Sequence, residues 1–128
     1  MAAIKPETQG WLDKAESSLN AAKMLLREGY ISESVSRAYY AMFYAAKAML
    51  AEDGISRNKH SGVIANFGER YARTGRITRE FHKQLNTAFE ERSRADYEYS
   101  WRMTEADARI RITEAEAFVQ EIKSQLRI

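Results

Sequence analysis

Residues 35–50 read Val-Ser-Arg-Ala-Tyr-Tyr-Ala-Met-Phe-Tyr-Ala-Ala-Lys-Ala-Met-Leu, and only Arg37 and Lys47 among them are charged. Apolar residues therefore surround the expected helix, which is typical of a helix at the centre of a bundle or in a subunit interface. A chain of 128 residues has few helices with which to cover such a helix on every side. We therefore predict a homodimer, with these aromatic residues in core and dimer contacts: Tyr39, Tyr40, Phe43 and Tyr44.

The flanking sequence predicts four more helices. The first is expected to begin at Pro6 and to end before Gly29, because proline suits a first helical turn and glycine accepts the positive φ of a helix end. Its apolar residues recur at spacings of three and four, at Leu12, Ala15, Leu19, Ala22 and Leu26. The other helices are expected from about Ser32 to Gly54, from Asn58 to Gly75, from Thr78 to Tyr99, and onward from the N-cap Thr104. Short connections between them predict an all-α, antiparallel up-and-down bundle of about five helices, as a single domain over residues 1–128.

Composition excludes several other classes of protein. Six Gly and one Pro are too few for an all-β fold, and the absence of Cys excludes disulfides and thiolate metal sites. The longest apolar run, residues 38–46, is too short to span a bilayer, and the amino terminus lacks the apolar core of a signal peptide, so we expect a cytoplasmic protein without membrane contact. Neither of the two His has a Glu three residues before it, which disfavours a di-iron site. We expect no metal and no cofactor.

Positive charge is concentrated in one segment, although the formal net charge is only +2. Residues 57–79 contain six cations, Arg57, Lys59, Arg70, Arg73, Arg76 and Arg79, against the single acid Glu69, a net charge of +5. Such a segment binds phosphates or an acidic partner, or it is a solvated helix face. The sequence leaves both interpretations open.

The fourth expected helix contains one arginine in an apolar register. The spacing of Phe81, Leu85 and Ala88 continues to Arg92, so this guanidinium is expected to face the core, where it needs a partner. Asp96 lies four residues further on, and we expect Tyr99, seven residues on, to share the same helix face. The arrangement is either a polar functional site or an ion pair that fixes the register of the bundle.

Three stretches of the chain resemble the HEPN domain family (higher eukaryotes and prokaryotes nucleotide-binding). They are Ser36–Ala48, the pair Lys59-His60, and Arg92-Ser93-Arg94-Ala95-Asp96-Tyr97. The resemblance implies a dimerising helical bundle, often paired with a small nucleotidyltransferase in a toxin–antitoxin-like system. In active members, an Arg followed after four to six residues by His cleaves RNA in the dimer cleft. In some members, the partner adenylylates a Tyr two positions past that His.

The chain departs from this motif at the catalytic histidine. Aligning the motif places Arg92 at the Arg position, Tyr97 where His is expected, and Tyr99 as the residue to be adenylylated. Tyr and Arg ionise near pH 10 and above pH 12, so neither is a ready base at neutral pH, although both can bind. We therefore expect a non-catalytic or weakly catalytic binding module. Its nucleotide or RNA contacts would be Arg92, Arg94, Lys59, His60 and the basic segment.

The alternative is a diverged ribonuclease toxin that uses Arg92, Asp96 and Tyr97. Two histidines bear on it. His60 is interpreted as a capping or surface residue at the start of the third helix, and the spacing of Arg76 and His82 as a chance match to the motif.

Overall fold

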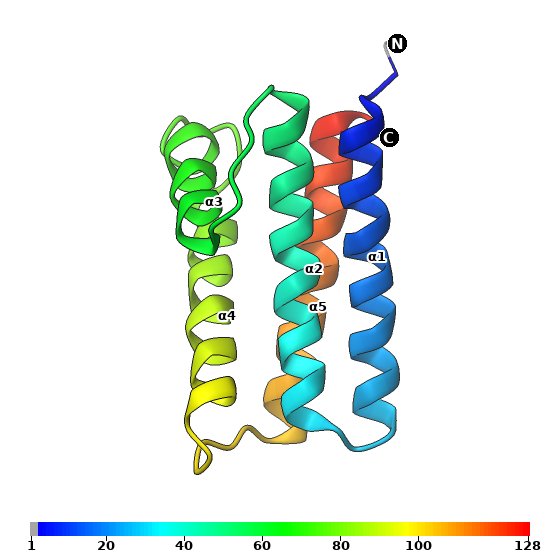
Figure 1. The fold of residues 1–128 in the computed structure, drawn as a ribbon, viewed down its shortest axis with the longest axis vertical. Helices are drawn as coiled ribbons and strands as arrows, with labels where there is room; N and C mark the ends of the chain where they lie inside the picture. The colour runs from blue at the N-terminus through cyan, green and yellow to red at the C-terminus, as the bar shows by residue number, and fades with distance from the viewer. Residues whose placement is uncertain (1–2) are drawn as a thin grey trace.

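The computed structural model describes residues 3–128, and these residues contain helices and loops but no strand. The helices are α1 (Pro6–Arg27), α2 (Ile31–Glu52), α3 (His60–Phe67), the π-helix η1 (Gly68–Ala72), α4 (Arg79–Tyr97) and α5 (Glu105–Leu126). The four long helices alternate in direction along the chain (Figure 1). The predicted all-α antiparallel bundle is therefore confirmed.

Helix ends follow the sequence signals closely in α1 and α5. Pro6 begins α1, which ends at Arg27 with Glu28 as C-cap, and the next residue, Gly29, has φ 86°, a conformation that residues other than glycine rarely adopt. Thr104 caps α5 in a capping box: its side chain accepts from the Asp107 amide at 3.1 Å, while Asp107 accepts from the Thr104 amide at 3.1 Å. Both ends of α1 and the start of α5 agree with the sequence prediction.

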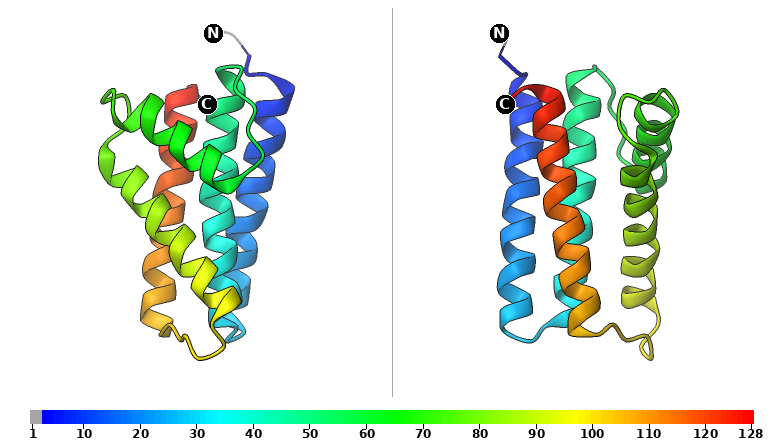
Figure 2. Two further views of the ribbon diagram at one scale, coloured as in Figure 1. Left: turned by 60° about the vertical axis from the view of Figure 1, so that its left-hand side comes forward. Right: turned by 180° about the vertical axis from the view of Figure 1, so that it is seen from behind.

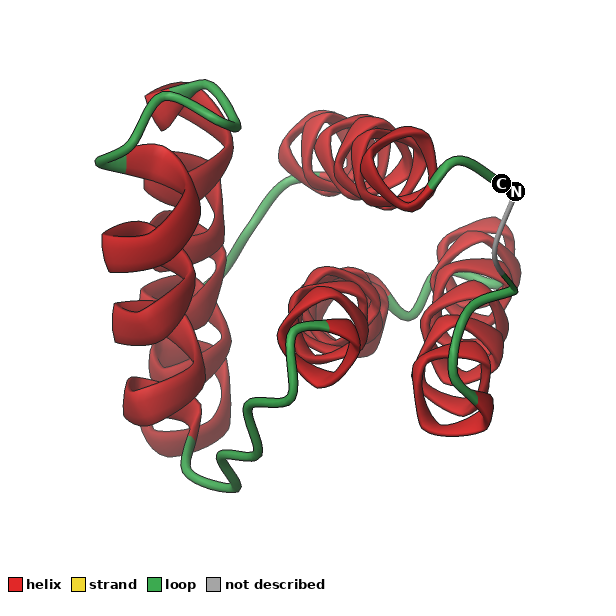
Figure 3. Cartoon of the chain, turned by 90° about the horizontal axis from the view of Figure 1, so that it is seen from above, coloured by secondary structure: helices red, strands yellow, loops and turns green. Residues whose placement is uncertain are grey.

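Helix α2 lies at the centre of the molecule. Seen from above, α1, α5 and the α3–α4 pair occupy three of its sides, and the fourth side carries no helix of the described chain (Figure 3). Tyr39 and Ala41 of α2 are fully buried, as is most of its apolar surface. The chain's own helices therefore cover three sides of α2, and the homodimer stays a prediction. No helix among residues 3–128 combines the length and hydropathy that a membrane crossing requires.

The third helix differs from the prediction of one helix from Asn58 to Gly75. It begins at His60, with Lys59 rather than Asn58 at the N-cap, and widens into η1 at Gly68. A Cβ on Gly68 would lie 2.5 Å from the His82 ring, so this glycine permits a close approach of η1 to α4. The α3–η1 segment runs obliquely to the long helices (Figure 2).

The fourth helix is shorter than predicted at its carboxyl end. It ends at Tyr97, and Tyr99 lies in the following loop with 94 % of its surface exposed. The expectation that Tyr99 shares a helix face with Arg92 is therefore wrong. The loop continues to Thr104, where α5 starts.

Candidate functional site

Arg92 lies at the junction of α4 with α2, packed against aromatic rings. Its guanidinium carbon is 5.4 Å from the ring centre of Tyr39, 5.6 Å from that of Tyr40 and 5.6 Å from that of Phe89. One terminal nitrogen donates to Asp96 at 3.0 Å, and the Arg92 side chain is only 13 % exposed. Its Nε is buried and has no hydrogen-bond partner among the described residues. The arginine is thus fixed by ring packing and one ion pair, with part of its hydrogen-bonding capacity unused.

The cation at this position is stable. Burial lowers the pKa of Arg92, but the hydrogen bond to Asp96 and the neighbouring Tyr40 and Tyr39 outweigh it, and the pKa is raised. Asp96 itself is 44 % exposed, so the pair lies at the edge of the core rather than inside it.

His60, at the start of α3, completes the same cluster. Its ring stacks on Phe43 at 4.2 Å between centroids, and its Nδ1 lies 2.5 Å from the Tyr39 hydroxyl. The interpretation of His60 as a capping or surface residue is therefore wrong, because the ring is half-buried between α2 and α4. The sequence places Tyr39 and Phe43 on one face of a helix, but only the tertiary structure brings His60 to them.

Electrostatics keep His60 neutral and Tyr39 protonated. Burial lowers the pKa of His60, and the positive charges of Arg92 and Lys47 lower it further. Burial raises the pKa of Tyr39 above its usual range. The Tyr39 hydroxyl and Nδ1 of the neutral ring share one hydrogen bond, whose direction depends on the imidazole tautomer. This bond engages Nδ1 and leaves Nε2 as the other polar atom of the ring.

Cations alternate with rings along the side of α2 that no helix covers. We call the following residues the aromatic–cation strip: Trp11, Lys14, Arg37, Tyr40, Tyr44 and Lys47. The Lys47 ammonium lies 4.0 Å from the Trp11 ring, Trp11 stacks on Tyr44 at 5.7 Å, and Arg37 lies 4.5 Å from the Tyr40 ring. The sequence analysis missed Trp11, Lys14, Arg37 and Lys47 as site residues. The helical spacing of Arg37, Tyr40, Tyr44 and Lys47 was the available signal.

Other residues singled out from the sequence lie elsewhere. Lys59 is adjacent to His60 and exposed. Arg94 pairs with Glu98 at 3.1 Å and lies 5.3 Å from the Trp101 ring, towards the α4–α5 loop. Tyr97 is 84 % exposed. The structure thus brings together Arg92, Asp96, His60 and the α2 aromatics, but not Arg94, Tyr97 or Tyr99.

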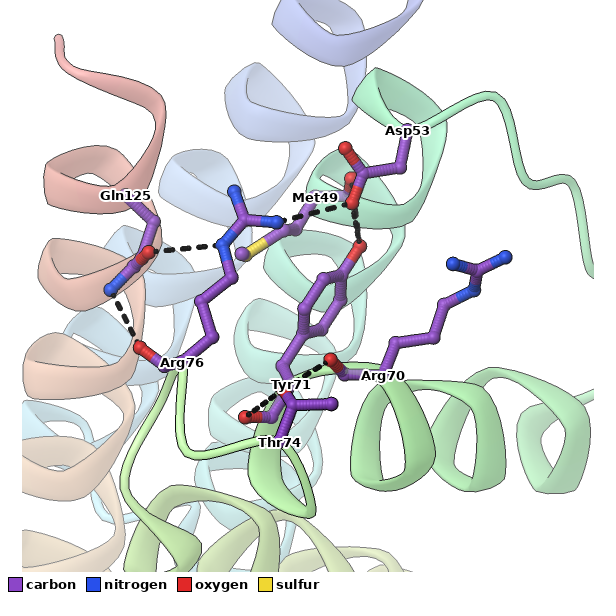
Figure 4. Close-up of polar contacts among 7 residues, drawn as sticks. All are labelled: Met49, Asp53, Arg70, Tyr71, Thr74, Arg76 and Gln125. Carbon is purple, nitrogen blue, oxygen red and sulfur yellow. Dashed lines mark hydrogen bonds and ion pairs between the residues drawn. The ribbon is translucent and has the colours of Figure 1, made fainter.

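The basic segment is dispersed, and part of it serves the fold. Figure 4 shows Arg76 between Asp53, at 3.5 Å, and Gln125 of α5, at 3.4 Å, while Tyr71 donates to the same Asp53 carboxylate at 2.6 Å. Tyr71 thus ties η1 to the end of α2, and Arg76 ties the loop after η1 to the ends of α2 and α5. Burial, together with the bond to Asp53, raises the pKa of Tyr71 above its usual range. The Arg70 side chain points away from this network (Figure 4).

Arg76 and His82 do not share a site. His82 lies 3.1 Å from the carbonyl oxygen of Ile64, whereas Arg76 faces Asp53 and Gln125. Within residues 3–128, no group of three or more His, Asp or Glu side chains is placed to hold a metal ion.

The chain is thus a small helical bundle with a central tyrosine-rich helix, against which Arg92 packs while paired with the carboxylate of Asp96. These features indicate the class of the domain, but they do not indicate a reaction. Residues 8–125 match the family model described as HEPN domain. The chain belongs to the HEPN family.

Its relatives are similar over nearly their whole length. UPF0332 protein glr0978 of Gloeobacter violaceus is 41 % identical over 118 residues, which cover 91 % of this chain and 94 % of the relative. A UPF0332 protein of Thermotoga maritima is 36 % identical, covering 88 % and 86 % of the two chains. A Methanocaldococcus jannaschii protein named "Putative toxin MJ0605" is 37 % identical, covering 97 % and 92 %.

Proposed function

We propose that this HEPN-family chain is a binding module that holds phosphates and bases of single-stranded RNA, or of a nucleotide, at Arg92, His60 and the aromatic–cation strip. The observation that carries the proposal is the arginine packed against three rings beside a neutral histidine. Guanidinium groups bind phosphate oxygens bidentately, and exposed aromatic rings stack on bases of any sequence. Arg94, Lys59 and the basic segment would add only long-range attraction.

The chemistry of His60 favours binding over cleavage. A general base needs a free lone pair and a pKa near the working pH. The Nδ1 of His60 is engaged by the Tyr39 hydroxyl, and burial and two nearby cations lower the pKa of the ring and so weaken it as a base. In the tautomer protonated at Nε2, the neutral ring can donate a hydrogen bond to a phosphate oxygen.

Equilibrium binding of a fluorescein-labelled single-stranded RNA, followed by anisotropy, tests this proposal. Arg92→Ala is expected to weaken binding at least tenfold. Arg109→Ala is the matched control, because Arg109 also pairs with an acid one turn away, Glu105 at 3.1 Å, but on the exposed surface of α5. Equal losses in the two variants would show charge attraction without a site, and RNA that does not bind would contradict the proposal. Competition by ATP or GTP would show that a nucleotide occupies the same place.

A diverged ribonuclease toxin is the second candidate, favoured by the placement of His60 beside Arg92 and by the toxin names of two relatives. It requires Arg92, Asp96 and Tyr97, or His60 in place of the missing motif histidine, to act on the 2′-hydroxyl. Cleavage of RNA by purified protein that is abolished in both Arg92→Ala and His60→Ala would establish it. RNA that stays intact after prolonged incubation would contradict the ribonuclease hypothesis and favour the binding module.

The toxin names also support a paired system. We propose a homodimer that associates with a small nucleotidyltransferase, and Tyr99 as the residue adenylylated by this partner. Tyr99 is 94 % exposed and so is accessible to another enzyme. Mass spectrometry after coexpression should show one added nucleotidyl group that is absent in Tyr99→Phe. An unchanged mass would contradict the assignment.

Sedimentation equilibrium tests the dimer separately. A mass twice that of the chain at micromolar concentration is expected. A monomer mass would contradict the dimer without affecting the binding proposal.

A further inference from the structure

A second basic region lies between η1 and α4, away from Arg92. Here the surface encloses a hollow of about 460 Å³, a volume within the range of small-ligand sites. Its cations are Arg73 of the η1 end, and Arg79 and Lys83 of α4. Glu90 is the only acid in its lining.

One face of α4 supplies most of the wall. Five residues of α4 line the hollow, and spacings of three and four connect Arg79 to Lys83, Lys83 to Asn86 and to Thr87, and Thr87 to Glu90, so their side chains project to the same side. Four of the five can donate hydrogen bonds. From Arg79 to Thr87 these donors extend along about 12 Å of helix.

Two of the three cations around the hollow are not used in ion pairs within the described chain. Arg73 pairs with Glu69 at 2.9 Å, but Arg79 and Lys83 form no ion pair with any residue from 3 to 128. In this they differ from Arg76, which ties the loop after η1 to α2 and α5.

The floor of the hollow depends on Gly68. A Cβ on residue 68 would lie only 2.5 Å from the ring of His82, which is hydrogen-bonded to the Ile64 carbonyl oxygen at 3.1 Å. Asn86 in turn lies 3.4 Å from His82. The wide π-helical turn at Gly68 thus lets the floor come close to α4 and orders one of the donors. Such turns are frequent at functional sites.

We propose that this hollow binds a small anion with two or more linked phosphoryl groups, independently of the proposed function at Arg92. Inorganic pyrophosphate and the phosphate chain of a nucleotide share this chemistry. A single phosphate can contact the neighbouring Arg79 and Lys83, but it leaves the rest of a donor row about 12 Å long unused, whereas linked phosphates extend further along the row towards Asn86 and Thr87.

Calorimetric titration with sodium pyrophosphate tests the proposal, with ADP and a short single-stranded RNA as further arms. Pyrophosphate is expected to bind saturably, and Arg79→Ala and Lys83→Ala are each expected to weaken binding at least tenfold. Both residues are exposed, so the variants should fold, which thermal unfolding verifies. ADP binding with the same sensitivity, and tighter than pyrophosphate, would identify a nucleotide as the source. ADP binding no tighter than pyrophosphate would identify the inorganic anion.

Two controls make the test specific. Arg70→Ala removes an exposed cation of η1 that does not line the hollow, and it should change the affinity for pyrophosphate less than twofold. Arg109→Ala, which removes an exposed cation of α5 outside the hollow, should also leave it unchanged. The proposal would be overturned if pyrophosphate did not bind saturably, or if Arg70→Ala weakened its binding as much as Arg79→Ala does. It would also be overturned if, of the ligands tested, only the RNA bound with an affinity that depends on Arg79 and Lys83.

Discussion

Arg92 is the residue whose position the sequence predicts best. The spacing from Phe81, Leu85 and Ala88 assigns it a core-facing register, and the side chain is only 13 % exposed. The sequence does not indicate how deeply the pair with Asp96 is buried, because that depends on where α4 ends and what covers its last turn. Asp96 is 44 % exposed, so water shares the charge.

This exposure predicts a small stability change on loss of the carboxylate. Asp96→Ala is expected to lower the free energy of unfolding by less than about 1 kcal/mol, as for exposed pairs. A fully buried pair would instead cost about 3–5 kcal/mol, because removal of one partner strands the other charge. Guanidinium chloride unfolding of the two proteins measures the difference. A loss above 3 kcal/mol would contradict the half-buried geometry.

His60 shows what the sequence could not reveal. Its neighbours Tyr39, Phe43 and Phe89 come from two other helices, and no local spacing connects them to residue 60. Only the Lys59-His60 pair of the family resemblance drew attention to it. Its contacts depend on the tertiary arrangement that places the first residue of α3, His60, against rings of α2 and α4.

The environment of His60 predicts a pH dependence of stability. The groups that face it are Tyr39, Lys47 and Arg92, and its pKa in the folded chain is below the unfolded value of about 6.5. Between these two pKa values the unfolded chain binds more protons, so stability rises with pH. The stabilisation is complete above about pH 6.5 and is lost as the pH falls through the folded pKa.

Denaturant unfolding at pH 5 and at pH 7.5 measures this effect. The wild type should lose more stability on acidification than His60→Gln, which lacks the titrating group. Proton NMR of the His60 ring, assigned with the His82→Gln variant, should give a pKa below 6.5. A value above 6.5 would contradict the described environment.

At the scale of elements, local signals determined helix ends where side chains or glycines act within one turn. The Thr104 capping box and Gly29 are such cases. The change from α3 to η1 escaped the sequence analysis, and so did the close contact at its first residue, because Gly68 meets the His82 ring, fourteen residues away. An isolated glycine in a helical pattern was the only local sign.

Gly68→Ala tests this cause. The new methyl group would meet the His82 ring, so we expect the free energy of unfolding to fall by about 1–3 kcal/mol, as for other overpacked sites. Gly10→Ala is the matched control: Gly10 lies inside α1 with nothing within 4 Å of an added Cβ, and alanine should stabilise the helix by up to about 1 kcal/mol. In the double variant with His82→Ala, the loss should be less than the sum of the single losses. Simple additivity would show that the close approach does not matter.

At the scale of the whole molecule, the centre of the bundle was predictable and its open side was not. The apolar run of residues 35–50 marked α2 as central. The chain's own helices cover three sides of α2 and leave the fourth to the aromatic–cation strip (Figure 3). Which residues face that side depends on how α1, α3 and α4 are arranged around α2, and no single helix reveals this.

In the proposed function, ligand phosphates and bases contact Arg92, His60 and the aromatic–cation strip. Chemical-shift mapping by NMR during titration with single-stranded RNA tests it most directly. The resonances of Arg92, His60, Trp11 and Lys47 should shift first and together. In Arg92→Ala, the affinity obtained from the remaining shifts should be at least tenfold weaker. Shifts confined to the exposed surface of α5 around Arg109, with the His60 and Trp11 resonances unchanged, would contradict the account.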